Sequence, residues 1–148
     1  MGYSTTCDAS HKVKAAGSHR THFVRHIARD ADITAGYDFG HANSTIDKAR
    51  THLNRSMVND GAGGFRPPVA TLTEDGWRPP SAELNDYIQA RLDTVTKTLR
   101  KDAVAVRPLV MKLDGAWWDE HCPEWEVDGM NAEAERLHAV MVGWAADR

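Results

Sequence analysis

The sequence has few of the features that mark secreted or membrane proteins. It has only two cysteines, Cys7 and Cys122, which are too few for a disulfide framework. No run of 18 apolar residues is present, so no membrane-spanning helix is expected. The N-terminus lacks the basic segment followed by an apolar stretch that marks a secretory signal. These absences predict a cytoplasmic protein with reduced cysteines and no membrane partner.

The charge of the chain is small but unevenly distributed. Its 148 residues include 18 Lys and Arg against 21 Asp and Glu, which gives a net charge of −3. Residues 1–55 carry a net charge of +3 and six of the eight histidines, whereas residues 56–148 carry −6. An anionic partner is therefore expected to contact the first third of the chain. The length fits a single domain over residues 1–148.

Hydrophobic spacing predicts an α+β fold. Helices are expected at 19–31, 45–58, 81–99 and 130–147, with a short helix and a turn in 114–128. Strands are expected at 6–14 and 103–113, and loops at 32–44 and 59–80. Because glycines and prolines are frequent in 59–80, we expect that segment to be a flexible excursion. Two strands are a small sheet for the last helix to cover, so we expect further strands after residue 148.

A histidine cluster is the first candidate site. On the expected helix, His19, His22 and His26 share one face, and Arg25 follows His22 by three residues. A guanidinium binds phosphate oxygens with two hydrogen bonds, and a neutral imidazole beside it can attack phosphorus or carry a proton. The alternatives are a solvated polar face or a zinc site that adds Cys7, although that spacing matches no recognised zinc motif.

Two further polar clusters have both a functional and a structural interpretation. Arg50 and Asn54 are four residues apart and would face a DNA backbone together, or belong to a mixed polar face behind a helix cap. Arg100 and Lys101 follow an expected helix, whose dipole favours cations at that end. The functional alternative for this pair is a phosphate-contacting junction between helix and strand.

Taken in order, these segments resemble the Mob/Pre family of plasmid mobilisation and recombination proteins. The resemblance covers residues 10–113 and depends on the combination of several short motifs. They are His11-Lys12-Val13-Lys14, His22-x-x-Arg25, Asn43-x-x-Ile46-Asp47-x-x-Arg50-Thr51-His52-Leu53-Asn54, and Arg100-Lys101-Asp102-Ala103-Val104.

The resemblance implies a relaxase, an enzyme that cuts one DNA strand at an origin of transfer and stays attached to the 5′ phosphate. The implied fold is an antiparallel sheet with flanking helices, of the histidine–hydrophobe–histidine type. Carried over by position, His22 is the nucleophile and Arg25 a phosphate contact, with His19, His26, Tyr3 and Tyr37 as rival nucleophiles. The implied contacts to single-stranded origin DNA are Lys12, Lys14, Arg50, His52, Asn54, Arg100 and Lys101.

The sequence departs from the family pattern in two respects. The segment between Arg25 and Asn43 is longer than in that pattern, which is why His19 and His26 are rivals of His22, and a metal-binding motif is missing. The family has a third motif, resembling His-x-Asp-Glu-x-x-Pro-His-x-His, which holds Mn²⁺ or Mg²⁺. No such string occurs here, and in family order it would begin shortly after residue 144. Because the cation neutralises charge that develops on the phosphate, we expect a truncated relaxase region that binds no metal and has negligible nicking activity. The alternatives are a non-catalytic DNA-binding or regulatory module and a histidine-rich metal-binding protein.

Overall fold

A computed structural model describes residues 5–15, 17–39, 46, 48–122 and 127–146. The chain divides into two compact units, which we call the central unit, Ala9–Pro108, and the terminal unit, Met1–Asp8 with Leu109–Arg148. The α+β class expected from the sequence is confirmed, with five α-helices and small antiparallel strand pairs in the described residues. The sequence predicted one few-stranded sheet, whereas the described strands form four separate pairs.

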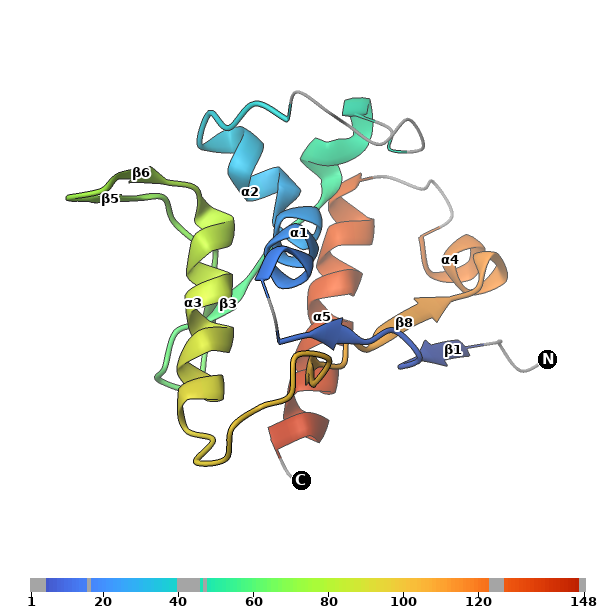
Figure 1. Ribbon diagram of the computed structural model, residues 1–148. Helices are drawn as coiled ribbons and strands as arrows, with labels where there is room; N and C mark the ends of the chain where they lie inside the picture. Colours follow the sequence, from blue (N-terminus) through green and yellow to red (C-terminus); the bar gives the residue numbers. More distant parts are fainter. Residues whose placement is uncertain (1–4, 16, 40–45, 47, 123–126, 147–148) are drawn as a thin grey trace. The chain divides into compact units, whose positions relative to one another are not determined.

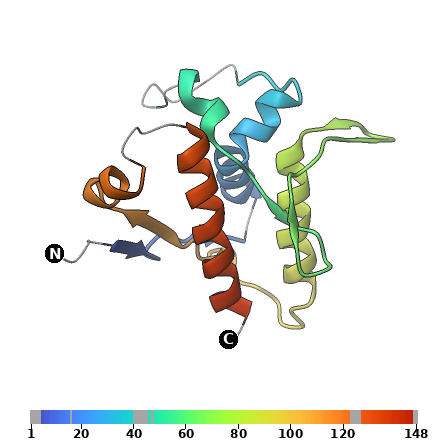
Figure 2. The ribbon, with the colours of Figure 1, turned by 180° about the vertical axis from the view of Figure 1, so that it is seen from behind.

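The central unit contains three α-helices, a 3₁₀-helix and three of the strand pairs (Figures 1 and 2). Its helices are α1 Gly17–Ile27, α2 Arg29–Thr34, η1 Lys48–Leu53 and α3 Pro80–Asp93. Its strands are β2 Val13–Lys14, β3 Val58–Asn59, β4 Phe65–Arg66, β5 Thr71–Thr73, β6 Gly76–Arg78 and β7 Val104–Val106. The pairs are β2 with β7, β3 with β4 and β5 with β6.

The helix expected at 19–31 is present as two shorter helices. Helix α1 ends at Ile27 and α2 begins at Arg29, with Ala28 in a turn between them. Arg20, Val24 and Ala28 recur every four residues and are all buried, because that spacing places them on one face of α1. The apolar spacing of the segment predicted burial of Phe23, Val24, Ile27 and Ala31. Of these only Val24 is buried, whereas Ile27 is 45% exposed, because the buried face is turned toward Arg20 and Ala28.

The helix expected at 45–58 is wrong in type and length. Only the 3₁₀-helix η1 forms there, and β3 begins at Val58. Ser56 donates its backbone N–H to Asp30 Oδ2 over 2.9 Å and its hydroxyl to the Ile27 carbonyl over 3.0 Å. These bonds to the end of α1 and to α2 fix Ser56 in a position that an α-helix through residue 58 would not allow.

Residues 59–80 form two hairpins instead of the predicted loop. The β3–β4 turn is closed by Asp60, whose Oδ1 accepts the Ala62 and Gly64 N–H groups over 2.7 and 2.9 Å. The β5–β6 turn places Gly76 at φ +116°, a left-handed conformation that glycine adopts without a steric penalty. The glycines that predicted disorder therefore serve as turn residues.

The strand expected at 103–113 is divided by Pro108, which has no N–H to donate to a ladder. Its first part, β7, pairs with β2 in the central unit. Its second part, β8 Val110–Leu113, pairs with β1 Thr5–Asp8 in the terminal unit, with Cys7 opposite Met111. The strand expected at 6–14 is likewise two strands, with β1 in the terminal unit and β2 in the central unit.

The remaining helices follow the predictions with shifted ends. Helix α3 ends at Asp93 instead of 99, where Thr94 Oγ1 donates to the Arg91 carbonyl over 2.7 Å. In the terminal unit, α4 spans Gly115–His121 and α5 spans Val127–Ala146. Asp114 caps α4 by accepting the Trp117 N–H over 2.9 Å. Among the described residues, no helix is long and apolar enough to cross a membrane.

Candidate nucleic-acid interface

Helix α1 carries the candidate residues and is attached to α3 by a buried arginine. Arg20 donates Nε–H to Asn85 Oδ1 over 2.8 Å and an Nη2 hydrogen to Gln89 Oε1 over 2.7 Å. Arg20 is only 9% exposed, and Val24, one turn further along α1, is 2% exposed. These contacts fix which side of α1 faces the protein, so the opposite side faces solvent.

His19, His22 and His26 occupy that solvent side, and we call them the histidine face. All three are exposed, as expected for residues about half a helical turn away from the buried Arg20–Val24–Ala28 stripe. His19 Nδ1 accepts the backbone N–H of Lys14 over 3.1 Å, which ties the start of α1 to β2. This arrangement agrees with the prediction from the sequence that the three imidazoles share one face of the helix.

Arg25 lies over an aromatic ring, and its charge acts on a buried carboxyl group. Its guanidinium carbon is 5.2 Å from the centre of the Tyr37 ring, a cation–π distance. Asp32 is fully buried, and its Oδ1 accepts the Ser81 N–H over 2.7 Å. Burial raises the pKa of Asp32, while the bonds to Ser81 and the charge of Arg25 oppose that rise. The Tyr37 ring, from the segment after α2, is therefore the group that contacts the Arg25 guanidinium.

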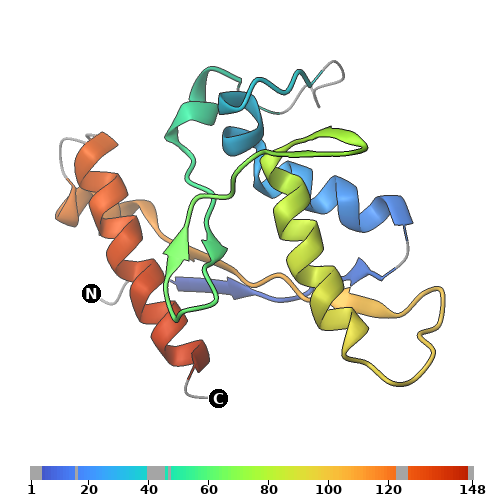
Figure 3. The ribbon, with the colours of Figure 1, turned by 90° about the vertical axis from the view of Figure 1, so that its left-hand side faces the viewer.

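Strand pairing assembles a second cationic group, which we call the basic edge: Lys12, Lys14, Arg100 and Lys101. Figure 3 shows β2 beside β7, with Lys14 opposite Val104. Ala15 donates its N–H to the Ala103 carbonyl over 2.8 Å, and Ala103 donates to Arg100 over 2.9 Å, which closes a turn around Lys101. All four side chains are exposed. The segment that contains Lys12 and Lys14 and the segment that contains Arg100 and Lys101 are about 90 residues apart in the sequence. The pairing of β2 with β7 therefore brings them together.

The other candidates lie around η1 or outside the described residues. His52 and Asn54 are exposed, and the Ser56–Asp30 bonds place this segment beside α2. The Arg50 side chain and the whole of Tyr3 and Asn43 lie outside what the structure describes. Arg100 and Lys101 follow α3 by several residues, so the predicted helix-dipole interaction at its C-terminus is wrong.

An aromatic cluster of Tyr37, Phe39 and Trp77 was missed by sequence reasoning. Tyr37 and Phe39 have ring centres 4.8 Å apart at 69°, and Tyr37 and Trp77 have centres 6.4 Å apart at 18°. The Arg29 guanidinium carbon lies 4.7 Å from the Phe39 ring centre. Trp77 is 40 residues beyond Tyr37, so no local spacing could have linked them.

Within the described part of the chain, no group of three or more His, Cys, Asp or Glu side chains is arranged to hold a metal ion. The histidine face and Cys7 belong to that part, so the zinc interpretation has no support from their geometry. The described residues likewise offer no fitting set of ligands for the Mn²⁺ or Mg²⁺ that the resemblance implies. Comparison of the chain with family models, curated proteins and solved structures found no match.

Proposed function

We propose that this chain is a single-stranded-DNA-binding region of a plasmid mobilisation relaxase of the Mob/Pre type. The observation that carries the proposal is the meeting of the basic edge and α1. Lys14 pairs opposite Val104, directly after the turn that holds Arg100 and Lys101, and its own N–H bonds to His19 on the histidine face. Cations from both ends of the central unit therefore lie at the start of the helix that carries His22 and Arg25.

The chemistry of these groups suits a phosphodiester backbone. Lys and Arg neutralise phosphates and release counterions, which is the main source of sequence-independent DNA affinity. The first turn of α1 contains no acidic residue, so its positive dipole end adds to the attraction. His22 is exposed and lies about one turn from Arg25 on α1, and an imidazole at this spacing from a guanidinium suits a phosphodiester.

In the implied reaction, an imidazole nitrogen of His22 would form a bond to phosphorus. The bond from phosphorus to the 3′ oxygen would break, and that oxygen would leave with the electron pair and take up a proton. The sequence lacks the family's metal-binding string, and the described residues form no ligand group. We therefore assign DNA binding to this chain and no cleavage step through a divalent cation.

Fluorescence anisotropy with a labelled single strand of about 20 nucleotides, measured across a salt series, tests the binding. Each lost phosphate contact lowers the slope of log affinity against log salt by about 0.7 for a single strand. Combining Lys14→Ala, Arg100→Ala and Lys101→Ala should therefore reduce that slope by about 2. Lys112→Ala, an exposed cation on β8 in the terminal unit, is the control and should leave the slope unchanged. Absence of any binding at low salt would refute the proposal.

A second experiment tests the assignment of binding without cleavage. The chain is incubated with single-stranded origin-of-transfer DNA and Mn²⁺, and covalent adducts are detected on a denaturing gel. We expect none. An adduct that disappears in His22→Ala would establish His22 as the nucleophile and would show that cleavage does not need the missing motif.

A further inference from the structure

The aromatic cluster beside Arg25 includes an exposed tryptophan that phosphate binding does not explain. Trp77 lies on β6 and is 46% exposed, although Trp is normally among the more buried residues. Its cross-strand partner Leu72 is 82% exposed, and paired residues of two antiparallel strands point to the same face. The hairpin therefore presents an apolar and aromatic face to solvent.

This face is connected to the candidate interface through Tyr37. The Tyr37 and Trp77 rings are nearly parallel, at 18°, and Arg25 lies over the Tyr37 ring. Figures 1 and 3 show the β5–β6 hairpin passing the segment that follows α2, where Tyr37 lies. Arg25 is three residues from His22, which is a little less than one helical turn, or roughly 4.5 Å along the axis. Aromatic rings, a guanidinium and an imidazole thus follow one another across the surface.

We propose that Trp77 and Tyr37 form a stacking platform for the bases of single-stranded DNA, next to the phosphate contacts of α1. The proposal rests on the DNA-binding function proposed above and adds a site for the bases of that DNA. Unpaired bases expose the π faces that stack on aromatic side chains, whereas in a duplex those faces are covered by neighbouring bases. An arginine beside the rings supplies the complementary charge for the adjoining phosphate.

The fixed position of the rings supports this role. The Tyr37 N–H donates to the Asp32 carbonyl over 2.9 Å, which anchors the segment after α2. Next to Trp77, Arg78 forms an ion pair of 2.8 Å with Asp86 on α3, which ties β6 to that helix. Rings held in place by the scaffold lose little conformational freedom when a base stacks on them.

The charge on the β5–β6 hairpin indicates the path of the bound DNA strand. Glu74 and Asp75 form the exposed tip of the turn, where they repel phosphates. The Trp77 ring stacks on Tyr37, and Arg25 of α1 lies over Tyr37. Along this series of contacts, the acidic tip is at the Trp77 end, and Arg25 and the histidine face are at the other end. The phosphate backbone is therefore expected to run from Trp77 toward α1 and away from the tip.

The test uses the wild-type chain with two labelled strands of equal length and charge, one with normal bases and one with abasic residues. Base–aromatic stacking should make the normal strand bind at least about fivefold more tightly. Trp77→Ala should lose this advantage for the normal strand and bind the abasic strand like wild type. The salt dependence should stay the same in both proteins, because stacking releases no counterions.

Two variants control for indirect effects. Trp77→Phe retains an aromatic face and should keep most of the preference, whereas Trp77→Leu retains apolar bulk and should lose it. Trp144→Ala removes a tryptophan of similar exposure, 54%, from the terminal unit and should change nothing. Equal binding of normal and abasic strands by the wild type would overturn the platform while leaving the DNA-binding function standing. Failure to bind either strand would instead refute the function itself.

Discussion

The central and terminal units stabilise their elements by different kinds of contact. In the central unit, buried polar side chains bond across large sequence separations, such as the 69 residues between Arg20 and Gln89. In the terminal unit, Asp114 caps its own helix α4, and Arg136 pairs with Glu133 three residues away. The polar contacts of the central unit fix helix orientation, which directional bonds do better than apolar packing.

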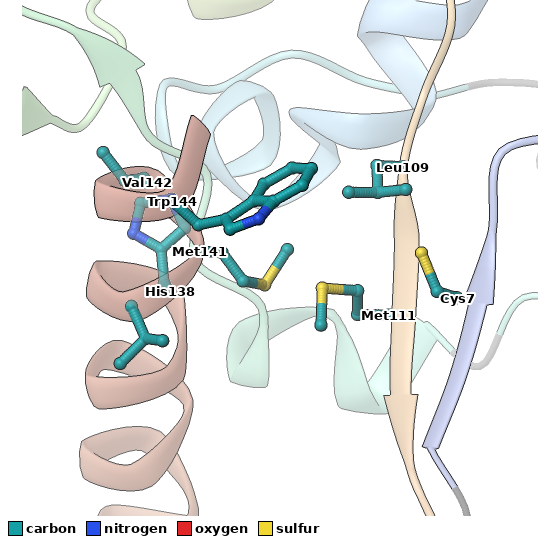
Figure 4. A pocket seen from close by; sticks show the side chains of 8 residues that line it. Cys7, Leu109, Met111, His138, Met141, Val142 and Trp144 are labelled. Atoms are coloured by element: carbon teal, nitrogen blue, oxygen red, sulfur yellow. The ribbon is translucent and has the colours of Figure 1, made fainter. Parts of the chain in front are cut away.

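The terminal unit instead surrounds an apolar pocket of about 470 Å³. Figure 4 shows Met141 and Trp144 extending from α5 toward Met111 on β8, with Cys7 on the neighbouring strand. Trp144 and Met111 are 54% and 49% exposed. Because each half-exposed apolar side chain has lost only part of its contact with water, we expect this unit to gain less stability from each residue than the central unit does.

The sharpest test of this contrast is Arg20→Ala, which should lower the free energy of unfolding by about 3 kcal/mol. The change removes two hydrogen bonds from a charged donor and the packing of the side-chain stem. Urea denaturation followed by circular dichroism measures the loss. Gln89→Ala is the matched control: its side chain is exposed, so its effect should stay near 1 kcal/mol. Equal effects for both variants would mean that the Arg20 bonds do not anchor α1.

Local pattern located α1, α3 and α5, but it failed at the helix expected at 45–58 and at the buried polar side chains. The apolar spacing of 19–31 and 81–99 located α1 and α3, although Ile27 of α1 and Tyr87 of α3 are 45% and 49% exposed. Arg20 and Asp32 are charged residues, which are normally exposed, yet both are buried. Their burial depends on Asn85, Gln89 and Ser81, which lie 49 to 69 residues away and leave no signal in the local sequence.

In the candidate site, too, local spacing predicted some features, while others depend on contacts between distant segments. The shared face of His19, His22 and His26 follows from helical spacing alone, and all three side chains are exposed. The juxtaposition of Lys14 with the Arg100–Lys101 turn follows from antiparallel pairing of β2 and β7, which spacing does not specify. The Tyr37–Trp77 contact needed the β5–β6 hairpin, which the sequence analysis took for a loop because of its glycine content.

A smaller effect is expected at Asp32, where burial and charge oppose each other. Asp32→Ala leaves the Ser81 N–H without its acceptor and should cost about 1–2 kcal/mol. Asp32→Asn keeps an acceptor oxygen and should cost less at neutral pH. Burial raises the pKa of Asp32 above its ordinary value of 3.8, so the folded state holds this proton more tightly than the unfolded state. The resulting stabilisation is complete below pH 3.8 and is lost as pH rises through the raised pKa.

The difference in unfolding free energy between wild type and Asp32→Asn isolates this pH dependence. Measured by urea denaturation at several pH values, the wild type should lose stability relative to the variant as pH rises above 3.8. A difference that stays constant across that range would show that burial does not perturb the carboxyl group.

The smallest effects are expected in the terminal unit. Met111→Ala and Trp144→Ala each remove a side chain that remains about half exposed, so each should cost less than about 1 kcal/mol. Val24→Ala in the central unit removes only two methyl groups, yet it should cost about 2 kcal/mol because Val24 is 2% exposed and its loss leaves a cavity. Thermal unfolding of the three variants compares them directly. If Met111→Ala destabilised the chain more than Val24→Ala, the apolar pocket would be a tightly packed core, and the contrast between the two units would have to be abandoned.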